Sequence, residues 1–301
     1  MAWNWKTFNT RALTALLFAA VMLAGLLINE WTFLLLFTVI HFGCWYEYQK
    51  LVGLIDAGYR SIHPLHRYGV MLAGFSLMLF LTKDWYITSS VSLYSIGWML
   101  GLVSVFVLPV IEILFSRQVN FKNVAHSFFG LVYISLSFAL LLNIRSGALW
   151  LPKQDGNVLS GFAEVMAKIS AYIVPLIIIG SIWINDTMAY IVGSLVGKTP
   201  LSSVSPKKTW EGTIGGVILS VLIMWGIGSW SQSSSAWFWA AIAAIASVAG
   251  TVGDLLESKL KRMAGVKDSG SIMPGHGGFL DRFDSLLLAT PFVWLFLWLI
   301  E

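Results

Sequence analysis

The feature that most constrains the fold is a series of long apolar stretches that take up most of the chain. A transmembrane helix needs about 20 predominantly apolar residues. The pattern therefore predicts an all-α, polytopic integral membrane protein with about nine transmembrane helices. The predicted spans are residues 12–28, 31–49, 67–82, 90–115, 124–142, 168–193, 212–228, 236–252 and 286–300.

Composition supports the membrane class and weakens other classes. Of the 301 residues, 57% are hydrophobic and only 11% are charged, whereas a soluble domain is about half apolar and about a quarter charged. The net charge of +4 is explained by basic loops on the cytoplasmic side, so we expect no nucleic-acid partner. Cys44 is the one cysteine of the chain, which excludes an intrachain disulfide.

The basic residues predict how the chain is oriented. Lys6 and Arg11 precede an apolar stretch without a convincing cleavage site, so we interpret this stretch as a first transmembrane helix rather than a signal peptide. Most of the 19 basic residues then fall on the same side as the N-terminus. The exceptions are Lys83, Arg145, Lys153 and Lys168. We therefore expect a protein of the inner (cytoplasmic) membrane, with the N-terminus and the active site in the cytoplasm.

The chain shows no internal repeat and no soluble domain. We expect an N-terminal transmembrane bundle over residues 1–166 and a C-terminal catalytic region over 167–301, in one continuous membrane domain. The polar segments 185–212 and 253–285 lie on the cytoplasmic side, and the helical hairpin between them brings both to one face.

Two features of the first polar segment have a structural interpretation beside the functional one. GSLVGKT (193–199) has one residue too few between its glycines for a P-loop and follows a helix, so we expect the glycines to end that helix. Asp186 lies near the inner end of a span, where an ionisable group is a functional hypothesis by default. The alternative is a hydrated carboxylate at headgroup depth.

His41, Cys44 and Glu47 recur every three residues in the second span. All three types bind metals, but this spacing drifts around the helix and supplies no fourth ligand. We reject a zinc site and expect packing, with a Glu47 side chain that reaches up to the interface.

SPKKTWEG (205–212) places two lysines between a proline and the start of a span. They either anchor the helix at the interface or bind phosphate, and the residues alone favour neither reading.

The strongest signal is GDLLESKLKRMAGVKDSGSIMPGHGGFLDRFDS (253–285), which mixes acids, bases and glycines. Carboxylates suit Mg²⁺, which completes its octahedron with water and substrate phosphates. Lys and Arg neutralise phosphate oxygens, and glycines let the backbone approach an anion. The carboxylates are Asp254, Glu257, Asp268, Asp281 and Asp284, and the cations are Lys259, Lys261, Arg262, Lys267 and Arg282.

This block resembles the signature of the CDP-diacylglycerol synthase (phosphatidate cytidylyltransferase) family. The similarity is carried by Ser258, Lys261, Arg262, Lys267, Asp268, Gly270, Pro274, His276, Gly277, Gly278, Asp281, Arg282 and Asp284. NDTMAY and SPKKTWEG resemble the second block of the family, in which ADTGAY is more usual, so Asn185 and Met188 depart from it. The resemblance covers about residues 183–285.

The resemblance implies that CTP and phosphatidate yield CDP-diacylglycerol and pyrophosphate, with Mg²⁺ as cofactor and a second metal ion left open. It implies metal binding by Asp254 and Asp281. It also implies catalytic roles for Asp186, Lys207, Lys208, Lys267, Asp268, His276, Arg282 and Asp284. Nucleotide contacts are expected from Ser205, Lys261, Arg262, Gly277 and Gly278.

Two other functions remain open at this point. A CTP-dependent lipid kinase would need similar groups but would release CDP and a phospholipid. An ion or metabolite transporter could use Asp186 as its coupling site, although its charges would be spread along a path. A homodimer is also open, because Gly97/Gly101 and Gly212/Gly216 permit close helix packing within or between chains.

Overall fold

The computed structural model is a helical membrane protein. It describes residues 5–82, 85–115, 120–147, 161–231, 236–270 and 277–300. Six helical stretches in this part of the chain are long and apolar enough to cross a membrane, which confirms the all-α membrane class. They are Leu93–Phe115, Phe121–Arg145, Ala171–Val196, Trp210–Ser231, Ala236–Met263 and Leu280–Ile300. The count of nine spans stays a prediction.

The secondary structure is almost entirely α-helical, apart from one short antiparallel hairpin. The helices are α1 (Trp5–Leu27), α2 (Glu30–Ile55), α3 (Ala57–Arg60), α4 (Pro64–Phe80), α5 (Leu93–Phe115), α6 (Phe121–Gly130), the π-helical η1 (Leu131–Leu136), α7 (Ser137–Arg145), α8 (Gly161–Val196), α9 (Trp210–Ser231), α10 (Ala236–Met263) and α11 (Leu280–Ile300). The hairpin strands are β1 (Tyr86–Thr88) and β2 (Val91–Ser92). The predicted boundary after residue 166 falls inside α8 and stays a prediction.

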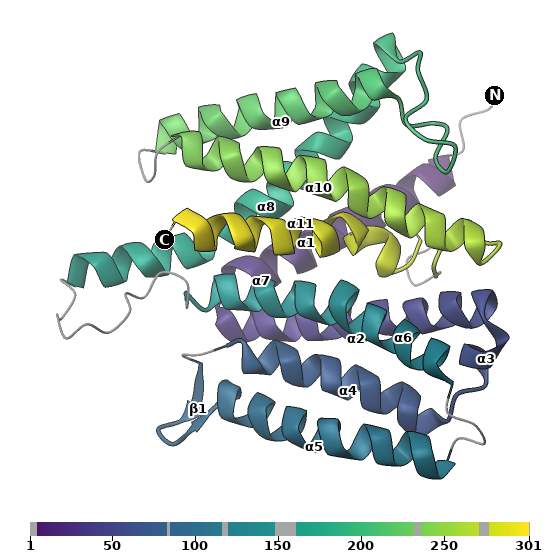
Figure 1. Ribbon diagram of the computed structural model, residues 1–301. Helices are drawn as coiled ribbons and strands as arrows, with labels where there is room; N and C mark the ends of the chain where they lie inside the picture. Colours follow the sequence, from purple (N-terminus) through teal and green to yellow (C-terminus); the bar gives the residue numbers. More distant parts are fainter. Residues whose placement is uncertain are drawn as a thin grey trace.

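The helices lie side by side in layers (Figure 1). α5 packs on α4 at one side, and α2 lies in the next layer together with the α6–η1–α7 stretch. α11 packs against α7 on one face and α10 on the other, while α9 packs on α8 and α10 at the far side. α11 therefore joins the two halves of the molecule.

The core is densest around α2. Phe33, Phe37 and Trp45 of this helix are fully buried, and the ring of Phe37 packs at a tilt against Phe138 of α7, with ring centroids 5.7 Å apart. The turns before and after α2 contain N-cap residues. Asn29 caps α2 and accepts a hydrogen bond from the Thr32 amide, and Asp56 caps α3 and accepts one from the Gly58 amide.

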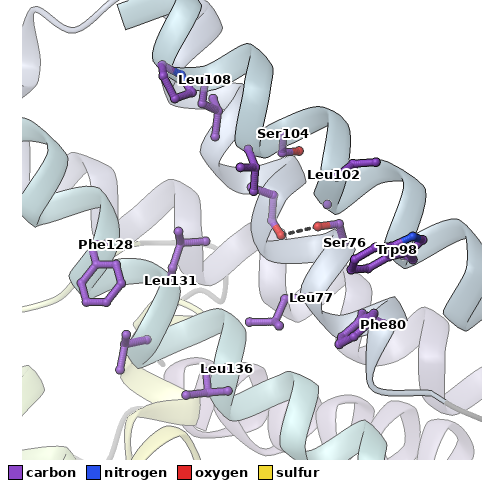
Figure 2. A pocket seen from close by; sticks show the side chains of 16 residues that line it. Ser76, Leu77, Phe80, Trp98, Leu102, Ser104, Leu108, Phe128, Leu131 and Leu136 are labelled. Atoms are coloured by element: carbon purple, nitrogen blue, oxygen red, sulfur yellow. Dashed lines mark hydrogen bonds between the residues drawn. The ribbon is translucent and has the colours of Figure 1, made fainter.

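α5 contributes least to this core. Most of its side chains are exposed, as expected for a helix that faces lipid tails. Between α5, α4 and the α6–η1–α7 stretch lies an apolar groove of about 630 Å³, with Trp98 and Phe80 at one end and Leu108 and Phe128 toward the other (Figure 2). The groove holds few polar groups, as expected for a surface that contacts lipid acyl chains.

Small residues set the distance between α8 and α9. A Cβ on Gly216 would lie 2.8 Å from both the Ala189 Cβ and the Asn185 carbonyl oxygen, and one on Gly212 would lie 2.9 Å from the Gly193 Cα. The Gly212/Gly216 pair thus serves packing within the chain, where it brings the first turn of α9 against the last turns of α8.

This packing predicts that Gly216→Ala destabilises the protein while Gly226→Ala, on the same helix, does not. Alanine at 216 forces α9 away from α8, which costs about 1–3 kcal/mol as overpacking. A Cβ on Gly226 meets no atom within 4 Å. Unfolding temperatures of the two variants in detergent test this, and equal temperatures would show that the contact is not tight.

Candidate active site

The polar residues of the C-terminal half converge on one cavity of about 560 Å³. It lies where the later turns of α8 and α10 meet the first turns of α9 and α11. Six of the predicted site residues line it. They are Asp186, Lys207, Lys208, Asp254, Asp281 and Asp284. Segments far apart in the sequence therefore form one site, as the two polar blocks predicted.

The two lysines are carried by a turn that the sequence explains. The Lys208 amide donates a hydrogen bond to the Ser205 carbonyl oxygen at 3.1 Å, which closes a turn with Pro206 at its second position, where proline is favoured. The Leu201 amide donates back to the Lys208 carbonyl oxygen at 2.7 Å. The turn holds Lys207 and Lys208 at the cavity, where Lys208 forms an ion pair with Asp254.

The GSLVGKT segment ends a helix, as predicted. α8 stops at Val196, and the Glu211 carboxylate accepts hydrogen bonds from the Lys198 and Thr199 amides at 3.1–3.3 Å. A P-loop would offer such amides to phosphate. Here a side chain of the same protein already occupies them.

Glycines in α10 place the carboxylates of two helices together. A Cβ on Gly253 would lie 2.5 Å from the Asp284 carbonyl oxygen, so the missing side chain lets α11 approach α10 at this level. As a result Asp254 and Glu257 of α10 meet Asp284 of α11, with carboxylate oxygens all within 4.8 Å of one another.

This group has the chemistry of a divalent-cation site. Glu257 is fully buried and Asp284 is 6% exposed. Within the described part of the chain, Glu257 Oε1 has no hydrogen-bond partner. Buried carboxylates this close repel one another, and Lys208 and Lys261 pair with only two of the three, Asp254 and Glu257. Hard oxygen ligands are those that Mg²⁺ prefers. The residues present therefore fit a magnesium ion.

Asp281 faces the same cavity but is held by other partners. Its Oδ1 accepts a hydrogen bond from the Lys261 ammonium at 2.6 Å, and Lys261 also forms an ion pair with Glu257. Its Oδ2 accepts from the Ser269 amide and hydroxyl, both at 2.9 Å, and from the Gly278 amide at 2.8 Å. Asp281 thus ties both ends of the loop 269–278 to α10, and its role as a metal ligand stays a prediction.

The expectation that Glu47 reaches the membrane interface is wrong. The side chain is 2% exposed, and its carboxylate accepts hydrogen bonds from the Ser269 hydroxyl at 2.7 Å and from the Phe279 and Leu280 amides at 2.9 and 2.8 Å. The latter two are amides at the start of α11 that have no partner within the helix. Glu47 therefore caps α11 and fixes the loop from the N-terminal half of the protein.

The glycines of this loop make room for the two carboxylates. Gly277 has a φ of 80°, and a Cβ there would lie 2.7 Å from Asp281 Oδ2. Side chains at Gly270 or Gly278 would overlap the Glu47 carboxylate. The packing of the loop requires glycine at these positions whether or not a ligand binds, so the nucleotide contacts of Gly277 and Gly278 stay predictions.

The remaining predicted residues do not line the cavity. Lys267, Asp268, Arg262 and Arg282 are exposed on the same end of the protein. His276 lies outside the described residues. Their catalytic and nucleotide-binding roles stay predictions.

Several polar residues of the site were not among the predicted site residues. Asn185 and Thr251 line the cavity, and the Asn185 amide donates to the Thr251 hydroxyl at 3.4 Å. Glu47 and Ser269 support the loop. For Glu47 a signal existed, because an acid in an apolar span is costly unless it has partners.

Removing the Glu47 carboxylate should release the start of α11. We expect Glu47→Ala to speed hydrogen exchange at the Phe279 and Leu280 amides by roughly tenfold or more, because hydrogen bonds to a charged acceptor contribute about 1.5–3 kcal/mol. Hydrogen-exchange mass spectrometry of the peptide covering 277–284 measures this.

Glu112→Ala is the matched control, because Glu112 is also a buried glutamate, paired with His66 at 2.6 Å away from the loop. It should leave exchange at 277–284 unchanged. Equal acceleration by both variants would mean that Glu47 acts through general stability alone.

Comparison with known proteins places this chain. The model of the cytidylyltransferase family matches residues 9–300. The chain is 36% identical to a phosphatidate cytidylyltransferase of Staphylococcus saprophyticus over 62% of this chain and 64% of the relative. It is 43% identical to a phosphatidate cytidylyltransferase of Synechocystis over 41% of this chain and 43% of the relative. It is 34% identical to the chloroplastic phosphatidate cytidylyltransferase 5 of Arabidopsis thaliana over 64% of this chain and 49% of the relative. The aligned region thus spans less than two thirds of each relative, whereas the family match extends over almost the whole chain, and the chain belongs to the cytidylyltransferase family.

Proposed function

We propose that this protein converts CTP and phosphatidate to CDP-diacylglycerol and pyrophosphate in phospholipid biosynthesis. The observation that carries the proposal is the cavity in which Lys207 and Lys208 face the carboxylates of Asp186, Asp254 and Asp284. Membership of the cytidylyltransferase family and the names of the relatives support the same reaction.

The position of the cavity suits one soluble and one lipid substrate. It lies near the ends of the helices, and the cavity-lining Tyr190 is 76% exposed. A nucleotide can enter from the water, while phosphatidate keeps its acyl chains in the leaflet and presents its headgroup at this depth. An exposed aromatic residue is favourable at such an interface.

The proposed reaction needs little covalent chemistry from the protein. A phosphate oxygen of phosphatidate attacks the α-phosphorus of CTP, the new P–O bond forms, and the bond from the α-phosphorus to the bridging oxygen breaks to release pyrophosphate. The nucleophile is already anionic, so no serine or cysteine is required. Lys207 and Lys208 neutralise phosphate oxygens, and the remaining task is to orient both substrates in line.

A magnesium ion is part of the proposal. Asp254, Glu257 and Asp284 would hold it, and Asp281 is a further predicted ligand that would have to exchange Lys261 for the ion. When bound, such an ion supplies positive charge that stabilises phosphate oxygens in the transition state. A second ion stays open.

We further propose nine spans in the inner membrane, with the N-terminus and the cavity in the cytoplasm. The positions of the first and last helices support an odd number of spans, because the first turn of α1 and the last turn of α11 lie on opposite sides of the bundle (Figure 1). The end that holds the cavity also carries Lys50, Arg60, Lys259 and Arg262, in line with a cytoplasmic location. A homodimer stays a prediction.

The reaction is tested by incubating purified protein with CTP, phosphatidate and Mg²⁺. We expect CDP-diacylglycerol and pyrophosphate, and a loss of about 10²–10³-fold in turnover for Asp254→Asn, because the variant would bind the proposed cation more weakly and lose the positive charge that stabilises the reacting phosphates. Lys122→Gln is the control, since Lys122 is exposed on α6, does not line the cavity and should retain activity. Release of CDP with a phosphorylated lipid would instead indicate a kinase, and no product with any lipid acceptor would exclude both enzymes.

The metal site is tested separately from turnover by titrating Mn²⁺ into metal-free protein and following its electron paramagnetic resonance. We expect Asp284→Asn to weaken binding by at least about tenfold, because even outer-shell changes at metal sites cost 10–100-fold. The Asp281→Asn variant distinguishes two roles of Asp281. If Asp281 is a metal ligand, the variant loses Mn²⁺ affinity to a similar degree. If Asp281 only anchors the loop, the variant keeps its Mn²⁺ affinity and shows altered hydrogen exchange in the loop. Unchanged Mn²⁺ binding by Asp284→Asn would refute the carboxylate group as the site.

A further inference from the structure

A second polar cavity lies in the N-terminal half, and it shares no lining residue with the candidate active site. It measures about 400 Å³ and is formed by the last turns of α2, by α3 and by the first turns of α4. We propose that this cavity binds the phosphate headgroup of an anionic phospholipid from the surrounding leaflet. This inference does not depend on the proposed reaction, but it rests on the proposed topology.

The first argument is charge. Lys50, Arg60 and Arg67 all line the cavity, and none of its described lining residues is a carboxylate. Among the described residues, none of the three forms an ion pair. Three cations around one hollow repel one another, whereas cations that only orient the chain can spread over the surface. Convergence of this kind favours an anion between them.

The second argument is that the cavity is built rather than accidental. Gln49 is 3% exposed, and its side-chain amide donates to the Arg67 carbonyl oxygen at 3.0 Å, which fixes the start of α4 to α2. Arg67 Nε is buried and has no hydrogen-bond partner within the described residues. A phosphate oxygen would supply that partner, and guanidinium geometry matches phosphate.

The third argument identifies a lipid rather than a soluble anion as the source. Tyr46 and Tyr68 line the cavity and are 67% and 61% exposed, and Leu54 and Met71 add apolar surface. Tyrosines beside cations at the end of membrane helices are typical of headgroup depth. Basic hollows between helices at the cytoplasmic face bind anionic headgroups. A soluble phosphate would gain nothing from the exposed apolar side of the cavity.

The site lies on the helix that also anchors the catalytic loop. Lys50 lies one turn after Glu47 on α2. This turn of α2 therefore contains both an exposed cation of the second cavity and the buried carboxylate that caps α11. A bound headgroup would therefore hold the end of α2 at the level where Glu47 supports the loop.

Native mass spectrometry of the full-length protein in detergent tests the site. The probes are dioleoyl phosphatidylglycerol and, as the uncharged match, dioleoyl phosphatidylcholine. We expect one phosphatidylglycerol molecule to bind preferentially, and Arg60→Gln/Arg67→Gln to lower this affinity roughly thirtyfold, from the loss of two cations near a headgroup. Lys207→Gln/Lys208→Gln removes the same charge from the other cavity and should leave the affinity unchanged.

Competition experiments separate the two sources of phosphate. Inorganic phosphate and glycerol phosphate should fail to displace phosphatidylglycerol at matched concentration, and displacement by either would overturn the lipid assignment. Equal loss in both double variants, or no loss in Arg60→Gln/Arg67→Gln, would overturn the site. If that variant does not fold, Lys50→Gln, at an exposed position, should still lower the affinity roughly fivefold.

Discussion

The rest of the structure depends on one buried carboxylate. Glu47 lies in the interior of α2, and its oxygens accept hydrogen bonds from Ser269 and from the first amides of α11. An isolated carboxylate at this depth would be very costly, but one that caps a helix and meets three donors is compensated by the helix dipole and by the hydrogen bonds. The contact joins the N-terminal helices to the acidic loop. It explains why the first half of the chain, which has few motifs, is needed to shape a site in the second half.

From this anchor the polar network continues to the cavity. Ser269 links Glu47 to Asp281, Asp281 binds Lys261, and Lys261 pairs with Glu257 beneath the cavity. Glu47 and Asp281 accept hydrogen bonds from donors on other segments, whereas Lys261 and Glu257 pair within α10, so the loop, α10 and α11 are fixed relative to one another. Buried polar networks specify a single arrangement when every member is satisfied. Glu257 Oε1, which has no hydrogen-bond partner among the residues that the structure describes, is the point at which the network would meet the proposed metal.

Much of the fold, and the identity of many site residues, can be predicted from the sequence. Both depend on the length of the apolar stretches and on the residue composition of the polar segments. Apolar length located the six helical stretches that are long and apolar enough to cross a membrane. The two mixed-charge blocks identified Asp186, Lys207, Lys208, Asp254, Asp281 and Asp284, which line one cavity. The partners of these residues do not follow, since they depend on tertiary approach. Gly253 lets α11 contact α10 and so brings Asp284 to Asp254 and Glu257, and Glu47 reaches its loop across more than 220 positions of sequence. A local pattern contains no information on either contact.

The charge of the cavity constrains how an anionic substrate can bind there. Asp186, Asp254, Asp281 and Asp284 face it together with Lys207 and Lys208, while Lys208 is already paired with Asp254 and Asp281 with Lys261. The lining alone therefore carries excess negative charge, which would repel a triphosphate. A polyphosphate would enter favourably only together with a cation that these carboxylates accept, so the nucleotide and the metal should bind cooperatively. The same acids that exclude free phosphate would then select the metal complex, and the lysines would contact the oxygens that the metal leaves uncovered.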